Sequence, residues 1–106
     1  MKLAELHWPE VEKLDREKIV ALIPVGSMEQ HGPHLPFQVD VFCASRLAED
    51  LEQKIPDVLL VPWLWAGVSA HHMDFPGSIT LPARVFIDVL HDICGSLNHH
   101  GFRRIV

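Results

Sequence analysis

The feature that most constrains the fold is a pair of short, continuous apolar runs, each followed by a long loop and an amphipathic segment. The first run, Ile19–Val25 (IVALIPV), and the second, Asp57–Leu64 (DVLLVPWL), show no regular alternation of apolar and polar residues. Continuous runs of this length are typical of parallel strands that are covered on both faces. The two runs therefore predict strands inside a parallel sheet.

The segments around these runs predict helices and a third strand. In Asp40–Ile55, and again from near Pro82 to Gly101, apolar residues recur with the 3.6-residue period of a helix. Phe102–Val106 is the expected start of a third strand, and Leu3–Leu14 that of a short surface helix. The order strand–helix–strand–helix–strand gives two right-handed crossover units. The predicted class is α/β, a parallel sheet in βαβαβ order with helices on both faces.

Composition narrows the class of partner. The chain has 106 residues, 48% hydrophobic and 22% charged, which is typical of one globular domain or a piece of one. Its net charge is −5 and it has no basic run, which disfavours nucleic acid as a partner. The first fifteen residues contain no apolar signal-peptide core, so we expect a cytoplasmic protein. The longest apolar stretch, Val58–Val68, is far short of the ~20 residues of a membrane-spanning helix, so no membrane partner is expected.

Two long loops are the expected location of function. Gly26–Gln38 and Trp65–Leu81, of 13 and 17 residues, leave the carboxyl ends of the first two strands. Connections in α/β units are usually ~2–6 residues long, and longer loops are usually functional. Ligands of open α/β sheets bind beyond the carboxyl ends of the strands. The sequence therefore predicts a site between these loops.

The first loop holds three candidate metal ligands. Pro33 and Pro36 disfavour a helix there, so Glu29 and His31 are expected on an extended segment, where a spacing of two points their side chains the same way. Asp40 adds a carboxylate where the next helix begins. Oxygen and nitrogen ligands of this kind suit zinc, manganese or cobalt. From residue types alone a second interpretation stays open, in which Asp40 is a helix N-cap and the other two are solvated loop residues.

Two segments carry a resemblance to a known family. PVGSMEQHGPHLPFQVD, residues 24–40, resembles the signature of the creatininase family (creatinine amidohydrolase and relatives), and VSAHHMDFPGSITL, residues 68–81, resembles a second loop of the same family. Two matching loops at the right separation are more specific than either alone. The resemblance covers the whole chain. It implies a creatininase-like three-layer sandwich that is incomplete here, with residues 1–106 as a single partial domain lacking the C-terminal part.

The resemblance also implies an activity and a site. The activity is metal-dependent hydrolysis of a C–N amide bond in a small amide, cyclic or otherwise. The complete site would hold two divalent ions, zinc and/or manganese, with Glu29, His31 and Asp40 among the ligands and Asp40 bridging the ions. Further ligands and the general base are expected beyond Val106, so no catalytic residue is expected within the chain, and we expect the isolated chain to be inactive. Family membership also implies a homo-oligomer.

An alternative from a different class stays open. Because residues 1–106 lack the further ligands that the resemblance implies, the chain could be a non-catalytic truncated product. It could also be an interaction module that docks on a full-length partner.

Five further residues are expected near the substrate pocket or behind the ligands. His72 could line the pocket or support the ligands, and His34 could hydrogen-bond to one of them. Phe75, Gly77 and Ser78 resemble the family's FPG turn, which shapes the site. Without the resemblance, the two histidines would be polar loop residues and the FPG segment an ordinary turn.

Two residue pairs have simpler expectations. Trp63 and Trp65 lie two apart and could wall a pocket, but at least one is predicted to pack in the core. Cys43 and Cys94 have no CxxC partner and are predicted to be reduced, buried and apolar in role.

Overall fold

The structure is a computed structural model that describes residues 1–106, and it contains a three-stranded parallel sheet. The strands are β1 (Val20–Leu22), β2 (Val58–Leu60) and β3 (Arg104–Ile105), in the order β2-β1-β3. In the register, Val20 lies opposite both Val58 and Arg104. The predicted parallel sheet is confirmed, and β1 is its central strand.

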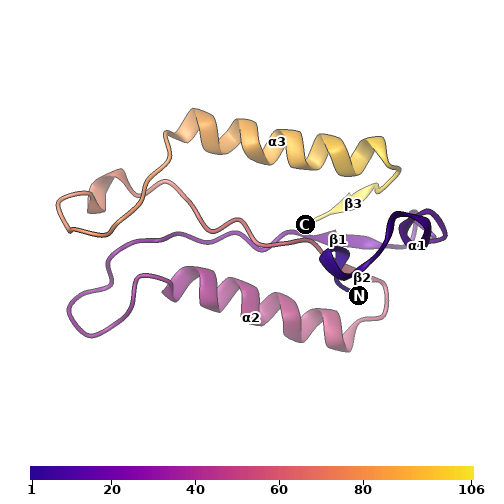
Figure 1. Cartoon of the computed structure of the whole chain (residues 1–106), viewed down its shortest axis with the longest axis horizontal. Coiled ribbons are helices and arrows are strands. Elements are labelled where there is room, and N and C mark those ends of the chain that lie inside the picture. Colours follow the sequence, from indigo (N-terminus) through magenta and orange to yellow (C-terminus); the bar gives the residue numbers. More distant parts are fainter.

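Two long helices pack on opposite sides of this sheet (Figure 1). They are α2 (Val39–Lys54) and α3 (Ala83–His99), and their bounds follow from local sequence. Helix α2 ends immediately before Ile55, which precedes Pro56 and is therefore pushed out of the helical region. Helix α3 is followed by Gly101 at φ +93°, a left-handed conformation that favours glycine. The α/β class with helices on both faces is confirmed.

The hydrophobic core lies where the strands pair. Ala21 of β1 and Leu59 of β2 are completely buried, and residues from α3 and the segment before β3 complete the cluster. β2 is buried on both faces, and the alternate residues of β1, Val20 and Leu22, are half-buried, which agrees with the uninterrupted apolar runs of these two strands. The core residues are Ile19, Ala21, Ile23, Leu59, Val61, Leu97 and Phe102.

The strands are shorter than the apolar runs predicted for them. β1 and β2 have three residues each. Pro24 and Pro62 have no N–H to donate, so the regular ladder cannot continue through them. The two chains nevertheless stay side by side, because Val25 and Leu64 form an isolated parallel bridge. The loops therefore leave the sheet already adjacent to each other.

The prediction of a single helix over Leu3–Leu14 is wrong. The segment forms a 3-10 helix, η1 (Leu3–Glu5), and a separate five-residue helix, α1 (Trp8–Glu12). Pro9 explains the break, because a proline ring clashes with the carbonyl four residues earlier and is tolerated only in the first turn. It lies in the first turn of α1.

Two burial predictions are also wrong. Trp63 and Trp65 are 52% and 45% exposed, because both lie past Pro62, outside the paired strand and away from the core. Cys43 is exposed, since it lies two positions after the buried Val41 and therefore on the opposite side of α2. Both cysteines are free. No helix combines the length and hydropathy that crossing a bilayer requires.

Candidate metal site

The two long loops run together beyond the sheet. Met28 and Ile79 form an antiparallel bridge, in which the Ile79 N–H donates to the Met28 carbonyl at 2.8 Å. A backbone bond within the second loop, from the Leu81 N–H to the Gly67 carbonyl at 2.9 Å, closes that loop on itself. The bridge places the two loops side by side beyond the sheet, where the sequence predicts one site.

Glycines allow a close approach at two points of this junction. A Cβ on Gly26 would lie 2.6 Å from the Cα of Val41, and one on Gly67 would lie 2.8 Å from Ser27 Oγ. Distances of this kind leave no room for a side chain. The first contact fixes the beginning of α2 against the first loop, which positions Asp40.

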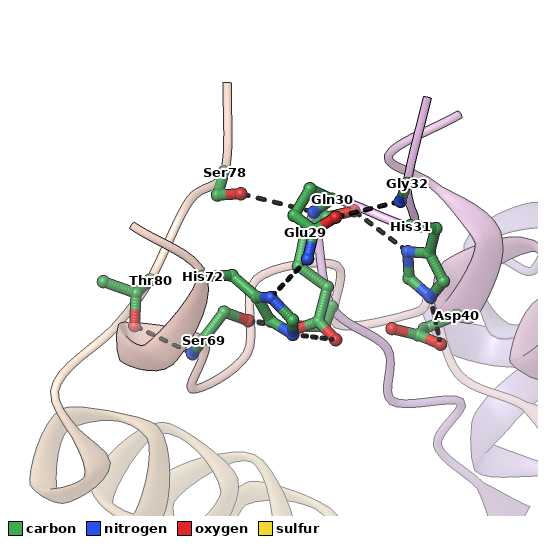
Figure 2. Close-up of polar contacts among 10 residues, drawn as sticks. Glu29, Gln30, His31, Gly32, Asp40, Ser69, His72, Ser78 and Thr80 are labelled. Carbon is green, nitrogen blue, oxygen red and sulfur yellow. Dashed lines mark hydrogen bonds and ion pairs between the residues drawn. The ribbon is translucent and has the colours of Figure 1, made fainter. Parts of the chain in front are cut away.

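The three candidate ligands converge. Each of Glu29, His31 and Asp40 offers one ligand atom, and these atoms all lie within 4.8 Å of one another. His31 Nε2 lies 3.4 Å from Asp40 Oδ1 (Figure 2). Asp40 is in the first turn of α2 and not at its N-cap, which is Gln38. The N-cap interpretation of Asp40 is therefore wrong, and its carboxylate faces the imidazole instead.

The orientation of His31 exposes a lone pair to this cluster. Its Nδ1 lies 3.0 Å from the Glu29 backbone carbonyl, which can only accept, so Nδ1 carries the proton. In the neutral ring, Nε2 then has a lone pair directed toward Asp40. A proton or a metal cation between this lone pair and the carboxylate would stabilise the contact, and an imidazole held through its other nitrogen is the usual arrangement of a metal-bound histidine. The donor set fits a divalent metal ion.

Glu29 is held in its charged form by a pair of serines. Its Oε2 accepts a hydrogen bond from Ser69 Oγ, and Ser27 Oγ, 2.6 Å from that hydroxyl, donates in turn to it. The hydrogen bond from Ser69 lowers the pKa of Glu29, burial opposes this, and Ser27, His72 and His71 lower the pKa further. An ionised carboxylate accepts only, as a metal ligand must.

Two of the five predicted pocket residues lie beside the candidate ligands, and the other three do not. His72 Nε2 lies 3.6 Å from Glu29 Oε1, and the buried Ser78 accepts a hydrogen bond from the Gln30 N–H at 3.2 Å, so both lie beside the ligands. Gly77, at φ +103°, lies under the ring of Phe37. His34 and Phe75 are exposed on the loops. His34 lies against Gly32, and Phe75 makes only backbone hydrogen bonds, to His72 and Ser78. Their role in a substrate pocket remains a prediction.

Ser27, Ser69, Thr80 and the Gln30 side chain were not predicted. Ser69 is completely buried, and its N–H donates to Thr80 Oγ1 at 2.9 Å. The only signal for Ser69 was its place in the second resembling loop. Its role depends on contacts between residues 40 or more positions apart, which spacing within one loop does not reveal.

Comparison with known proteins assigns the family. A family model described as creatininase, creatinine amidohydrolase, matches residues 4–106. The chain belongs to the creatininase family. It is 31% identical over 98% of its length to the creatinine amidohydrolase of Pseudomonas putida, of which it covers 42%. It is 36% identical over 78% of its length to the 3-dehydro-scyllo-inosose hydrolase of Thermotoga maritima, of which it covers 27%.

Solved structures agree with this assignment. A manganese creatininase aligns with a TM-score of 0.89 at 31% identity, over 98% of this chain and 42% of that one. A mutant creatininase of Zn–Zn type aligns with a TM-score of 0.88, also at 31% identity, over 98% of this chain and 42% of that one. The creatininase-like fold is thereby confirmed. The chain spans less than half the length of these relatives.

Proposed function

We propose that the chain is the metal-binding part of a metal-dependent amidohydrolase that hydrolyses the C–N amide bond of a small amide. The observation that carries the proposal is the convergence of Glu29, His31 and Asp40, whose ligand atoms lie within 4.8 Å of one another beyond the carboxyl ends of the strands. The family and the zinc and manganese forms of similar creatininases support it. A small amide is the proposed substrate because a similar protein is named a creatinine amidohydrolase.

Glu29, His31 and Asp40 would hold divalent metal, zinc and/or manganese, and in a complete site of two ions Asp40 would be the shared ligand. The Asp40 side chain is 40% exposed, and its Oδ1 faces His31. A divalent ion held there would polarise a carbonyl oxygen as a Lewis acid.

The chain's own residues hold and orient these ligands. Ser69 fixes the Glu29 carboxylate in its charged form, the Glu29 carbonyl fixes the His31 ring, and the first turn of α2 fixes Asp40. With a metal bound, these three groups would serve as ligands and would not move a proton. We propose that the general base is another residue, outside residues 1–106.

Metal binding by the full-length protein tests the proposal. Calorimetric titration with Zn²⁺ and with Mn²⁺ should show binding that Asp40→Asn weakens at least tenfold, because a neutral amide is a poor ligand. Asp92→Asn is the matched control, since Asp92 is exposed on α3 and remote from these ligands. Absence of binding by the unsubstituted protein, or an Asp40→Asn variant that binds as tightly, would contradict the proposal.

Exposed apolar residues favour a second candidate, a non-catalytic module that docks on another polypeptide, a full-length relative or a second copy. Trp8, Phe42 and Leu47 are 76%, 60% and 63% exposed. Large exposed apolar side chains are a feature of surfaces that contact other proteins. Amidase activity in the chain of residues 1–106, abolished by Asp40→Ala, would exclude this candidate.

A further inference from the structure

Gln30 is the residue between two candidate ligands, and its side chain joins the two loops (Figure 2). Its Oε1 accepts a hydrogen bond from the Gly32 N–H at 2.9 Å, and its Nε2 lies 2.8 Å from His72 Nδ1. Its own N–H donates to Ser78 Oγ. Three hydrogen bonds therefore fix both the backbone and the carboxamide of this residue.

These contacts assign the proton on the His72 ring. A backbone N–H can only donate, so the carboxamide atom next to Gly32 is the oxygen. The atom next to His72 Nδ1 is then the NH₂ group, which also can only donate, so Nδ1 must accept. In the neutral ring the single proton therefore lies on Nε2, the nitrogen that is 3.6 Å from Glu29 Oε1.

This proton position matters for Glu29. With the proton on Nε2, an N–H dipole faces Oε1, while Ser69 donates to Oε2. With the proton on Nδ1, a nitrogen lone pair would face Oε1 instead and repel it. The side chains of His72 and Glu29 are only 21% and 17% exposed, so water screens this repulsion poorly.

We propose that Gln30 is a positioning residue of the metal site, which selects the Nε2-protonated form of His72 and thereby orients the Glu29 carboxylate toward the ion. The part that concerns the ion rests on the proposed function. The assignment of the ring proton does not, because it follows from the hydrogen bonds alone.

The test measures the ring proton and metal affinity separately in the full-length protein. Two-bond ¹H–¹⁵N spectra of the metal-free protein, with His72 assigned from a His72→Gln variant, should show the proton on Nε2. Gln30→Met keeps the length of the side chain but removes its donor and acceptor, so His72 should populate both neutral forms. Zn²⁺ affinity should then fall about tenfold, the lower end of the effect of losing a partner of a metal ligand.

Two further variants separate positioning from a general structural role. Gln30→Glu still accepts from Gly32 but cannot donate to His72, so Nδ1 should become protonated, whether or not Nε2 keeps its proton. Gln53→Met makes the same change as Gln30→Met at an exposed position of α2 and should leave both the spectrum and the affinity unchanged.

Three results would overturn the inference. These are a wild-type His72 with its proton on Nδ1, a Gln30→Glu variant in which Nδ1 stays unprotonated, and a Gln30→Met variant with wild-type spectrum and affinity. If Gln30→Met does not fold, the other two measurements decide. A wild-type protein that binds neither Zn²⁺ nor Mn²⁺ would instead overturn the proposed function, while the metal-free spectra would still decide the role of Gln30.

Discussion

Leu59 in the strand layer and Ser69 where the two loops meet are both completely buried, but different kinds of group surround them. Leu59 packs in the aliphatic cluster where the strands pair, whereas Ser69 lies between a carboxylate and another hydroxyl where the loops meet. Apolar burial is non-directional and proportional to area. Hydrogen bonds to a charge depend on the identity and direction of each partner. The core should therefore determine stability, and the loop network should determine metal affinity.

The largest effect on stability is expected in the core. Leu59→Ala should lower the free energy of unfolding by about 2–5 kcal/mol, because it leaves a cavity in the strand layer. Zn²⁺ affinity of the folded protein should stay unchanged. Urea denaturation and calorimetric titration measure the two quantities. Leu47→Ala, at a position 63% exposed, is the control and should change stability by less than about 0.5 kcal/mol. A large loss of Zn²⁺ affinity in Leu59→Ala would contradict the claim that the core determines stability while the loop network determines metal affinity.

A smaller loss of stability, with a loss of affinity, is expected at Ser69. Ser69→Ala removes the donor to Glu29 Oε2 and should cost about 1–3 kcal/mol, the range for a buried hydrogen-bonding group left without its partner. Zn²⁺ affinity should fall with it, because Glu29 loses its orientation. The control is Ser96→Ala on the exposed side of α3, which should change neither quantity. If Ser69→Ala bound Zn²⁺ as tightly as the wild type, the hydrogen bonds of Ser27 and Ser69 would not be needed to orient Glu29 as a ligand.

Two glycines should respond in opposite directions to the same substitution. Gly77→Ala should destabilise by about 1–3 kcal/mol, because φ is +103° and the new Cβ would lie 2.7 Å from Phe37 Cζ. Gly95→Ala should stabilise by about 0.5–1 kcal/mol, because Gly95 lies within α3 with nothing within 4 Å of the added Cβ. Thermal unfolding of both variants checks the pair. If both substitutions changed the melting temperature in the same direction, the claim that the turn at Gly77 requires glycine would be contradicted.

The smallest effect concerns the pH dependence of two carboxylates. The pKa of Glu29 is lowered chiefly by Ser69, and that of the exposed Glu10 chiefly by the backbone N–H of His7. A lowered folded-state pKa contributes stability that is present above the unfolded value, 4.5 here, and is lost as the pH falls through the folded value. In an NMR titration of the metal-free protein, both groups should titrate below 4.5, and Ser69→Ala should raise the pKa of Glu29 alone. If Ser69→Ala shifted the pKa of both Glu29 and Glu10, the assignment of Ser69 as the chief cause for Glu29 alone would be contradicted.

The parts of the fold that follow from local pattern were predictable. The apolar period placed α2 and α3 within a residue or two of their bounds, and the continuous runs located both buried strands. The break between η1 and α1 does not follow from the apolar pattern, because it depends on Pro9, which is tolerated only in the first turn of a helix. Cys43 was misjudged because the buried side of α2 depends on the packing of the helix against the sheet.

The candidate site was predictable to a similar extent. Glu29, His31 and Asp40 lie within twelve residues of each other, so spacing and the family resemblance were enough to group them. The hydrogen bonds of Ser69 and Gln30 join loops that meet only in the folded chain. A serine or glutamine in a loop has many possible partners, and only the bridge between Met28 and Ile79 selects among them.

The most direct test of the central claim is the position of the ion in a zinc-loaded crystal of the full-length protein. The account predicts an anomalous peak about 2.0–2.2 Å from His31 Nε2 and from carboxylate oxygens of Glu29 or Asp40. A peak bound by other side chains, with these three residues left in their hydrogen bonds, would contradict it.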